Sequence, residues 1–88
     1  MKNVKITNMK VSGKTSVKSL ATSITRTQGT IILACIGASS VNQAVKACAI
    51  ARGFLATHGK DIYMIPFFSS TDIDGKNVSV INFKVEIR

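Results

Sequence analysis

The chain has 88 residues, the size of one small domain, and we expect residues 1–88 to form a single unit. Apolar residues make up 45% of it, which excludes an intrinsically disordered protein. No apolar run approaches the roughly 20 residues that span a membrane, and the N-terminus lacks the apolar stretch of a signal peptide. These features predict a cytoplasmic protein that does not associate with membranes.

The net charge of +8 comes from 12 basic and 4 acidic residues, and it is distributed unevenly. Residues 1–60 contain nine basic residues and no acidic one, whereas all four acidic residues lie within residues 61–88. A domain this basic attracts polyanions, because cations that neutralise phosphates release counterions. A basic surface that only keeps the protein in solution is the alternative. We favour nucleic acid as the partner because the stretch without a carboxylate is so long.

The first half of the chain predicts a strand, a helix and a second strand. A short strand over Asn8–Ser12 follows residues 1–7, which we interpret as an N-terminal extension. Apolar residues then recur at helical spacing after an N-cap at Thr15 or Ser16. Thr30–Ile36 is apolar on both faces, which is typical of a strand inside a sheet.

The second half predicts a longer helix and a β-hairpin. The helix opens at Ser40, and Gln43 follows at the spacing of a capping box. Asp61–Ser69 is again apolar on both faces, and an Asp-Gly pair after it predicts a tight turn. Val78–Ile87 alternates between apolar and polar residues, which places Asn82 on the polar side.

The predicted order of elements is therefore βαβαββ. Two βα units require parallel crossovers, and the hairpin adds an antiparallel strand. The expected fold class is α+β with two layers, in which two helices cover one face of a mixed four-stranded sheet.

Such a sheet leaves one face open, although the third strand is apolar on both sides. Within Asp61–Ser69, Phe67 points to one side and Phe68 to the other. A partner chain is the simplest cover for the exposed set. We expect a homodimer or tetramer whose interface contains Phe54, Phe67 and Phe68.

Residue types that support catalysis or metal binding are sparse. His58 is the single histidine, and its place at the end of the second helix fits a structural role beside the last carbonyl groups. Cys35 and Cys48 are 13 residues apart without a Cys-x-x-Cys motif, which indicates small core residues in a reducing compartment. Asp72 and Asp74 fit a turn better than a calcium loop or an acid–base pair. We expect no enzymatic activity, metal, cofactor or small-molecule substrate.

Each helix follows a strand through a junction that contains glycine. Such junctions present free N–H groups and the positive end of a helix dipole to an anion, and parallel βα units bring both to one edge of the sheet. Lys14 adds a cation at the first junction. Helix capping alone would also account for the serines. The predicted nucleic-acid-binding residues are Gly13, Lys14, Lys18, Ser39, Ser40, Asn42, Gln43 and Lys46.

The segment Ile36–Phe54, which contains an Asn-Gln-Ala-Val-Lys stretch, is the most distinctive part of the chain. Together with Val11–Ser16, Ile65–Phe67 and Ile73–Gly75, it resembles the stage V sporulation protein S family. The resemblance covers roughly residues 8–88. That family is similar in turn to the Alba chromatin and RNA-binding proteins, whose fold is βαβαββ, and to the C-terminal domain of translation initiation factor three.

The resemblance implies nucleic-acid binding by a dimer in the cytoplasm, with Lys14 on the nucleic-acid backbone and Lys46 alongside. Family members usually have glycine at the position of Ser39. The Alba hairpin arm is long and bears arginine, whereas Asp72–Lys76 is short and acidic. We therefore do not expect this arm to enter a minor groove.

Two functional hypotheses follow from the sequence. The first is a small protein that binds DNA or RNA mainly through phosphates, with weak sequence specificity because no aromatic platform or recognition helix is evident. It would regulate sporulation or gene expression and could associate with the nucleoid. The alternative is a regulator whose basic surface binds an acidic protein partner, with Phe67 and Phe68 as the contact.

Overall fold

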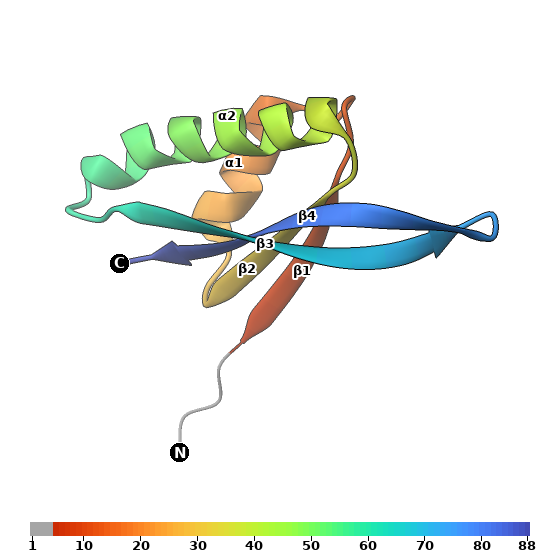
Figure 1. Ribbon diagram of the computed structural model, residues 1–88. Coiled ribbons are helices and arrows are strands. Elements are labelled where there is room, and N and C mark those ends of the chain that lie inside the picture. The colour runs from red at the N-terminus through yellow and green to blue at the C-terminus, as the bar shows by residue number, and fades with distance from the viewer. Residues whose placement is uncertain (1–4) are drawn as a thin grey trace, which may run out of the picture.

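The computed structural model describes residues 5–88 and shows one sheet with both helices against the same face (Figure 1). The elements are β1 (Ile6–Val11), α1 (Val17–Arg26), β2 (Thr30–Cys35), α2 (Ala38–Ala56), β3 (Ile62–Ile73) and β4 (Lys76–Ile87). The strand order in the sheet is β1-β2-β4-β3. β1 and β2 are parallel, and β4 lies antiparallel between β2 and β3. The predicted α+β fold, with a mixed four-stranded sheet and two helices, is confirmed.

The N-terminal extension predicted over residues 1–7 lies largely outside the described residues. Ile6 and Thr7 belong to β1, where they pair with Thr30 and Ile31 of β2. The first strand therefore begins two residues before the predicted Asn8.

α1 is fixed by a serine cap and an apolar stripe. The Ser16 side chain accepts a hydrogen bond from the backbone N–H of Ser19 at 3.3 Å, which satisfies one of the free donors of the first turn. Leu20, Ala21 and Ile24 are buried on the side that faces the sheet. The predicted cap and helical stripe are both confirmed.

α2 begins earlier than predicted. It starts at Ala38, two residues before Ser40, because Gly37 turns the chain into the helix with a φ of 87° that favours glycine. The predicted capping box is wrong. The Ser40 hydroxyl lies 2.7 Å from the carbonyl oxygen of Ile36 and 2.8 Å from that of Gly37, and the Gln43 amide bonds to another loop.

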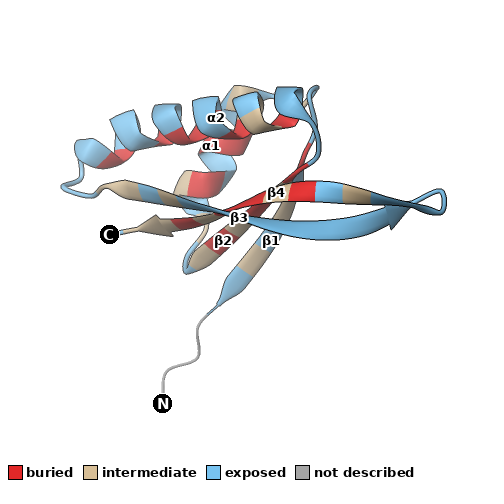
Figure 2. Ribbon diagram, in the orientation of Figure 1, coloured by how far each residue is buried: buried red, intermediate tan, exposed pale blue. Residues whose placement is uncertain are grey.

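The core fills the space between the helices and the sheet, as the red bands in Figure 2 show. Ala44, Ala47 and Ala51 are at most 1% exposed, and their small side chains let α2 lie close to the strands. Cys35 and Cys48 are free thiols inside this core, which confirms their predicted structural place. Burial raises the pKa of the Cys48 thiol to about 11, and the nearby Cys35 adds to that rise.

The β3–β4 hairpin is longer than predicted. Each strand has 12 residues, and pairing continues past Ser69 to the Asp74-Gly75 turn. Both turn residues have positive φ values, 50° and 77°, which matches the predicted Asp-Gly turn. The distal half of the hairpin projects beyond the helices (Figure 1), so the segment Asp72–Lys76 is the tip of a long arm and not a short connection.

The face of the sheet away from the helices, which we call the outer face, is open. Asn82 lies on this face, where the sequence predicts an exposed polar residue, and it is buried at 6% exposure. Its amide donates a hydrogen bond of 2.8 Å to the Ser69 hydroxyl on β3. A cross-strand hydrogen bond therefore replaces the contact with water that the alternation implied.

Candidate nucleic-acid interface

The two βα junctions lie against each other at one edge of the sheet. A Cβ atom on Gly13 would stand 2.8 Å from the Cβ of Ser39, closer than side chains normally approach. Gly13 belongs to the loop between β1 and α1, and Ser39 to the first turn of α2. The fold thus brings together the two segments that the sequence placed at one edge.

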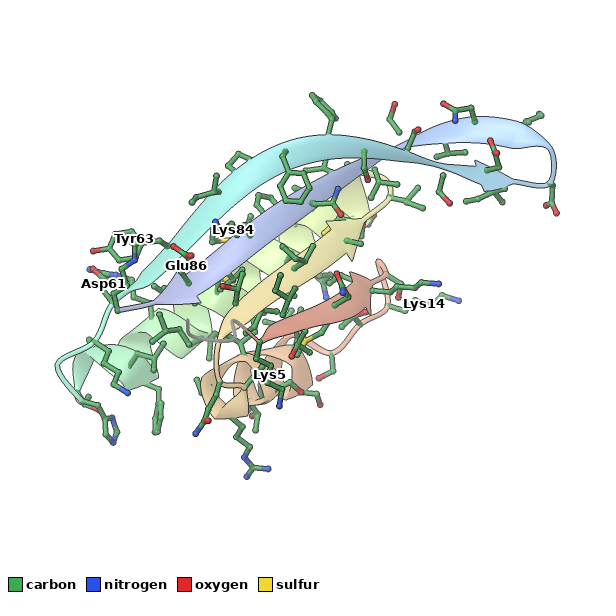
Figure 3. The ribbon with its side chains drawn as sticks, turned by 90° about the horizontal axis from the view of Figure 1, so that it is seen from below. Lys5, Lys14, Asp61, Tyr63, Lys84 and Glu86 are labelled. Carbon is green, nitrogen blue, oxygen red and sulfur yellow. The ribbon has the colours of Figure 1, made fainter. Side chains whose placement is uncertain are left out.

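Hydrogen bonds to side chains hold the loop of the first junction. The Ser12 backbone N–H donates to the Thr15 hydroxyl at 2.8 Å, and the Lys14 N–H donates to the Ser12 hydroxyl at 3.1 Å. A backbone hydrogen bond from Thr15 to the Ser12 carbonyl closes the same turn. These bonds hold the backbone that carries Lys14, whose side chain extends away from the end of β1 (Figure 3).

A long-range hydrogen bond locks the junctions together. The Gln43 side-chain amide on α2 donates to the carbonyl oxygen of Thr15 at 2.9 Å. Gln43 is half-buried, and its donor nitrogen is engaged by this contact. We therefore interpret Gln43 as a residue that positions the first loop.

The remaining predicted residues differ in how far they reach the surface. Ser40 is buried at 1% exposure, and its hydroxyl faces the end of β2, so it stabilises the second junction from inside. The other six predicted residues are all exposed: Gly13, Lys14, Lys18, Ser39, Asn42 and Lys46. Lys18 lines the groove between α1 and α2, and Asn42 lines the groove between α2 and the hairpin. We call these six residues the junction surface.

The junction surface is electropositive for two physical reasons. Neither helix has an acidic residue in its first turn, and Gly37 offers α2 no side-chain cap, so the N–H groups at the start of α2 stay free of side-chain acceptors. Within residues 5–88, the ion pairs are Arg52 with Asp61, and Lys84 and Arg88 with Glu86. The lysines of the junction surface are in none of these pairs.

The acidic partners in those ion pairs belong to the opposite end of the hairpin. A hydrogen bond from Arg52, 2.9 Å long, holds the pKa of Asp61 below its ordinary value. A hydrogen bond from Arg88 does the same for the pKa of Glu86, with a smaller effect from Lys84. Asp61 and Glu86 therefore remain charged and neutralise basic residues at that end. Asp72, nearer the hairpin tip, lines a groove together with Gly13 and Thr15 of the first junction.

The three phenylalanines predicted at an oligomer interface lie on different surfaces. Phe54, 56% exposed, stacks near His58 with ring centroids 4.7 Å apart beside the groove between α1 and α2. Phe67 is on the outer face of β3. Phe68, 78% exposed, lies on the helix side of the hairpin next to Val41 and Val45. One flat interface cannot include all three.

The described residues contain little that could hold a metal. Among residues 5–88, no cluster of three or more histidine, cysteine, aspartate or glutamate side chains has the arrangement of a metal site. The ring Nδ1 of His58 lies 3.2 Å from the Phe54 carbonyl oxygen, which agrees with its predicted place beside the last carbonyl groups of α2. None of the helices within that range is both long and apolar enough to cross a membrane.

The fold and the junctions define the class of protein. It is a small α+β protein of βαβαββ order that presents two βα junctions side by side on a basic edge. The family model for stage V sporulation protein S (SpoVS) matches residues 7–88, nearly the whole chain. The chain therefore belongs to the SpoVS family, as the resemblance predicted, and is a small sporulation-related protein.

The sequence did not identify Ser12 and Thr15 as parts of this site. They donate and accept the hydrogen bonds that shape the first loop and dock it on α2. A turn held by side-chain hydrogen bonds could have been predicted from the hydroxyl residues near Gly13, which are Ser12, Thr15 and Ser16.

Proposed function

We propose that this protein is a small, non-enzymatic nucleic-acid-binding protein that uses the junction surface to contact phosphates. The observation that carries the proposal is the contact between the two junctions. The approach of Gly13 to Ser39 brings the loop that carries Lys14 against the uncapped start of α2, the helix that carries Lys46. A phosphate there meets two cations and free backbone N–H groups together.

Binding of this kind is dominated by electrostatics. Lysine contacts to phosphates release counterions, so affinity falls with salt and depends little on base sequence. The net charge of +8 and the absence of acidic residues before Asp61 support long-range attraction of a polyanion. Such a protein would act in the cytoplasm, in association with the nucleoid, and regulate sporulation or gene expression through the nucleic acid that it binds.

We further propose that the protein works as a homodimer or tetramer. A groove of about 610 Å³ runs between α2 and the hairpin, and none of its lining residues is charged. Val45 and Phe68 expose 46% and 78% of their surface beside it. A second copy that covered the part of this groove at Val45 and Phe68 would bury apolar surface, and the dimer would carry two junction surfaces for one nucleic acid.

Gel mobility shifts with duplex DNA, single-stranded DNA and RNA test this function. Lys14→Ala and Lys46→Ala are expected to weaken binding to a similar extent on every sequence. Each is also expected to reduce the slope of log affinity against log salt by about one for each phosphate that the variant no longer neutralises.

Lys60→Ala is the matched control, because it removes the same charge from an exposed site beyond the far end of α2. The 19 residues of α2 separate the two ends by about 28 Å. An effect of Lys60→Ala equal to that of Lys14→Ala would show a diffuse field and no local site. If none of the three variants changes binding, the basic surface serves another purpose, and an acidic protein partner becomes the better hypothesis.

A further inference from the structure

The outer face of the sheet carries two exposed aromatic rings among basic residues. Tyr63 and Phe67 are 46% and 44% exposed on β3, four residues apart on the same face. That spacing is about 13 Å along a strand. The Arg88 guanidinium lies 5.2 Å from the centre of the Tyr63 ring, and Figure 3 shows Tyr63 and Lys84 together on this face.

One row of paired residues crosses all four strands of this face. Lys10 on β1 pairs with Ala34, Ala34 with Asn82, and Asn82 with Phe67 on β3. The two middle residues do not protrude from the sheet, because Ala34 is small and Asn82 is buried. Lys10 and Phe67 stand at its two ends.

A groove of about 720 Å³ connects this row to the first junction. Its lining includes Lys10, Gly13 and Thr15 on one side and the distal half of the hairpin on the other. Hydroxyl groups line much of it, from Ser12, Thr15, Ser69, Ser70 and Thr71. The outer face and the junction surface are therefore continuous at Gly13, which belongs to both.

The charges on the outer face complement a phosphate backbone. Lys10 and Lys84 are basic, and Glu86, the carboxylate beside Lys84, is already held by Lys84 at 3.6 Å and by Arg88. Asp72 also lines the groove, but near the hairpin tip, five residues or about 17 Å along β3 from Phe67. The part of the face around Phe67 is thus basic as well as aromatic.

We infer that the outer face binds single-stranded nucleic acid, with bases stacked on Phe67 and Tyr63 and phosphates beside Lys10 and Lys84. This inference rests on the proposed function and names the kind of strand that it favours. An aromatic ring on an open sheet reaches only bases that are not stacked inside a duplex. The sequence suggested no such platform because it has few aromatic residues; the fold puts two of them on one face.

A second copy of the chain is a weaker occupant for this face. Two outer faces in contact would bury Lys10 and Lys84 of both chains, and Glu86 pairs with Lys84 but not with Lys10. Burial of Lys10 without a carboxylate partner opposes association. A strand of nucleic acid supplies the missing negative charge at the same positions.

Single-stranded probes with and without bases distinguish base stacking from phosphate attraction. The probes are oligouridylate and oligothymidylate of about ten nucleotides, and an abasic strand of the same length, which keeps the phosphates and lacks the bases. We expect the base-bearing probes to bind more tightly than the abasic strand. Phe67→Ala should weaken their binding about 5- to 150-fold while changing abasic binding less than about twofold.

Phe54→Ala is the matched control, since it removes the same side chain from an exposed position on α2, away from the outer face. It should leave the ratio between base-bearing and abasic affinities unchanged. Phe67→Trp, which keeps an aromatic face, should retain that ratio even if Phe67→Ala folds poorly. Tyr63 is the single tyrosine in a chain without tryptophan, so base-bearing probes should quench the intrinsic fluorescence and heparin should not.

Three outcomes would overturn the inference. Equal affinity for base-bearing and abasic strands, without quenching of Tyr63, would leave phosphate binding at the junction surface intact and remove the stacking platform. Dissociation of an oligomer by Phe67→Ala, with the ratio unchanged, would assign the outer face to a second copy. Failure to bind any probe, duplex DNA included, would instead refute the proposed function itself.

Discussion

Adding one methyl group at Gly13 is expected to push the two βα junctions apart. The φ of Gly13 lies outside the range that favours glycine, so alanine can adopt the same backbone, and the effect is purely steric. The new Cβ would stand 2.8 Å from the Cβ of Ser39, inside normal contact distance. The Ser39 Cβ is attached directly to the first turn of α2, so relief requires a shift of the backbone.

The destabilisation by Gly13→Ala follows from the overpacking it creates. Extra methyl groups in packed positions typically destabilise a protein by about 1–3 kcal/mol. In a domain of this size each kcal/mol lowers the melting temperature by about 4–8 °C, which a thermal unfolding scan resolves easily. The same variant should weaken duplex binding, because the shift separates Lys14 from Lys46.

Ser39→Gly supplies the partner for a double-mutant cycle. It removes the Cβ atom that the new methyl group would meet. We expect Gly13→Ala to destabilise the protein by at least about 1 kcal/mol less in the Ser39→Gly background than in the wild-type background. Additive effects of the two substitutions would refute the argument that the junctions touch each other.

Two further predictions concern the core and the assembly. Because burial raises the pKa of Cys48 from 9.0 to about 11, there is a pH range in which the thiol keeps its proton in the folded state and loses it in the unfolded state. The free energy of unfolding should therefore fall between pH 9 and 11, by about 3 kcal/mol at most. Urea unfolding of Cys48→Ala should show a flatter pH dependence of this free energy. Identical pH dependence in the variant and the wild type would contradict this assignment. Light scattering at micromolar concentration should give a dimer or larger species, and Phe68→Ser should shift it toward the 9.4 kDa monomer. A wild-type protein that is already monomeric would rule out the proposed assembly.

The local sequence predicted those features that depend on neighbours in the chain. The Ser16 cap, the apolar stripe of α1 and the Asp-Gly turn all involve residues within a few positions of one another, and the structure has all three. The start of α2 was predicted two residues late for the same reason. Ser and Gln at capping-box spacing are a local signal, but here the fold engages Ser40 and Gln43 elsewhere.

The residues that meet across the candidate site could not be predicted in this way. The hydrogen bond between Gln43 and Thr15 joins positions 28 residues apart, and only the packing of α2 beside the first loop brings them together. Burial of Asn82 likewise depends on its hydrogen bond to Ser69, 13 residues earlier on β3. Strand alternation assigns side chains to two faces, but it does not say which face the helices cover.

By itself, the sequence determined the order of elements, the basic character of the first 60 residues and the apolar identity of the core, because periodicity and composition are properties of the chain alone. The tertiary structure decided the rest. Pairing of β4 between β2 and β3 aligns Phe67 with Lys10 across four strands, and packing of both helices on the other side leaves this face open. These relations arise from contacts between distant segments, whose energies depend on geometry that no local pattern contains.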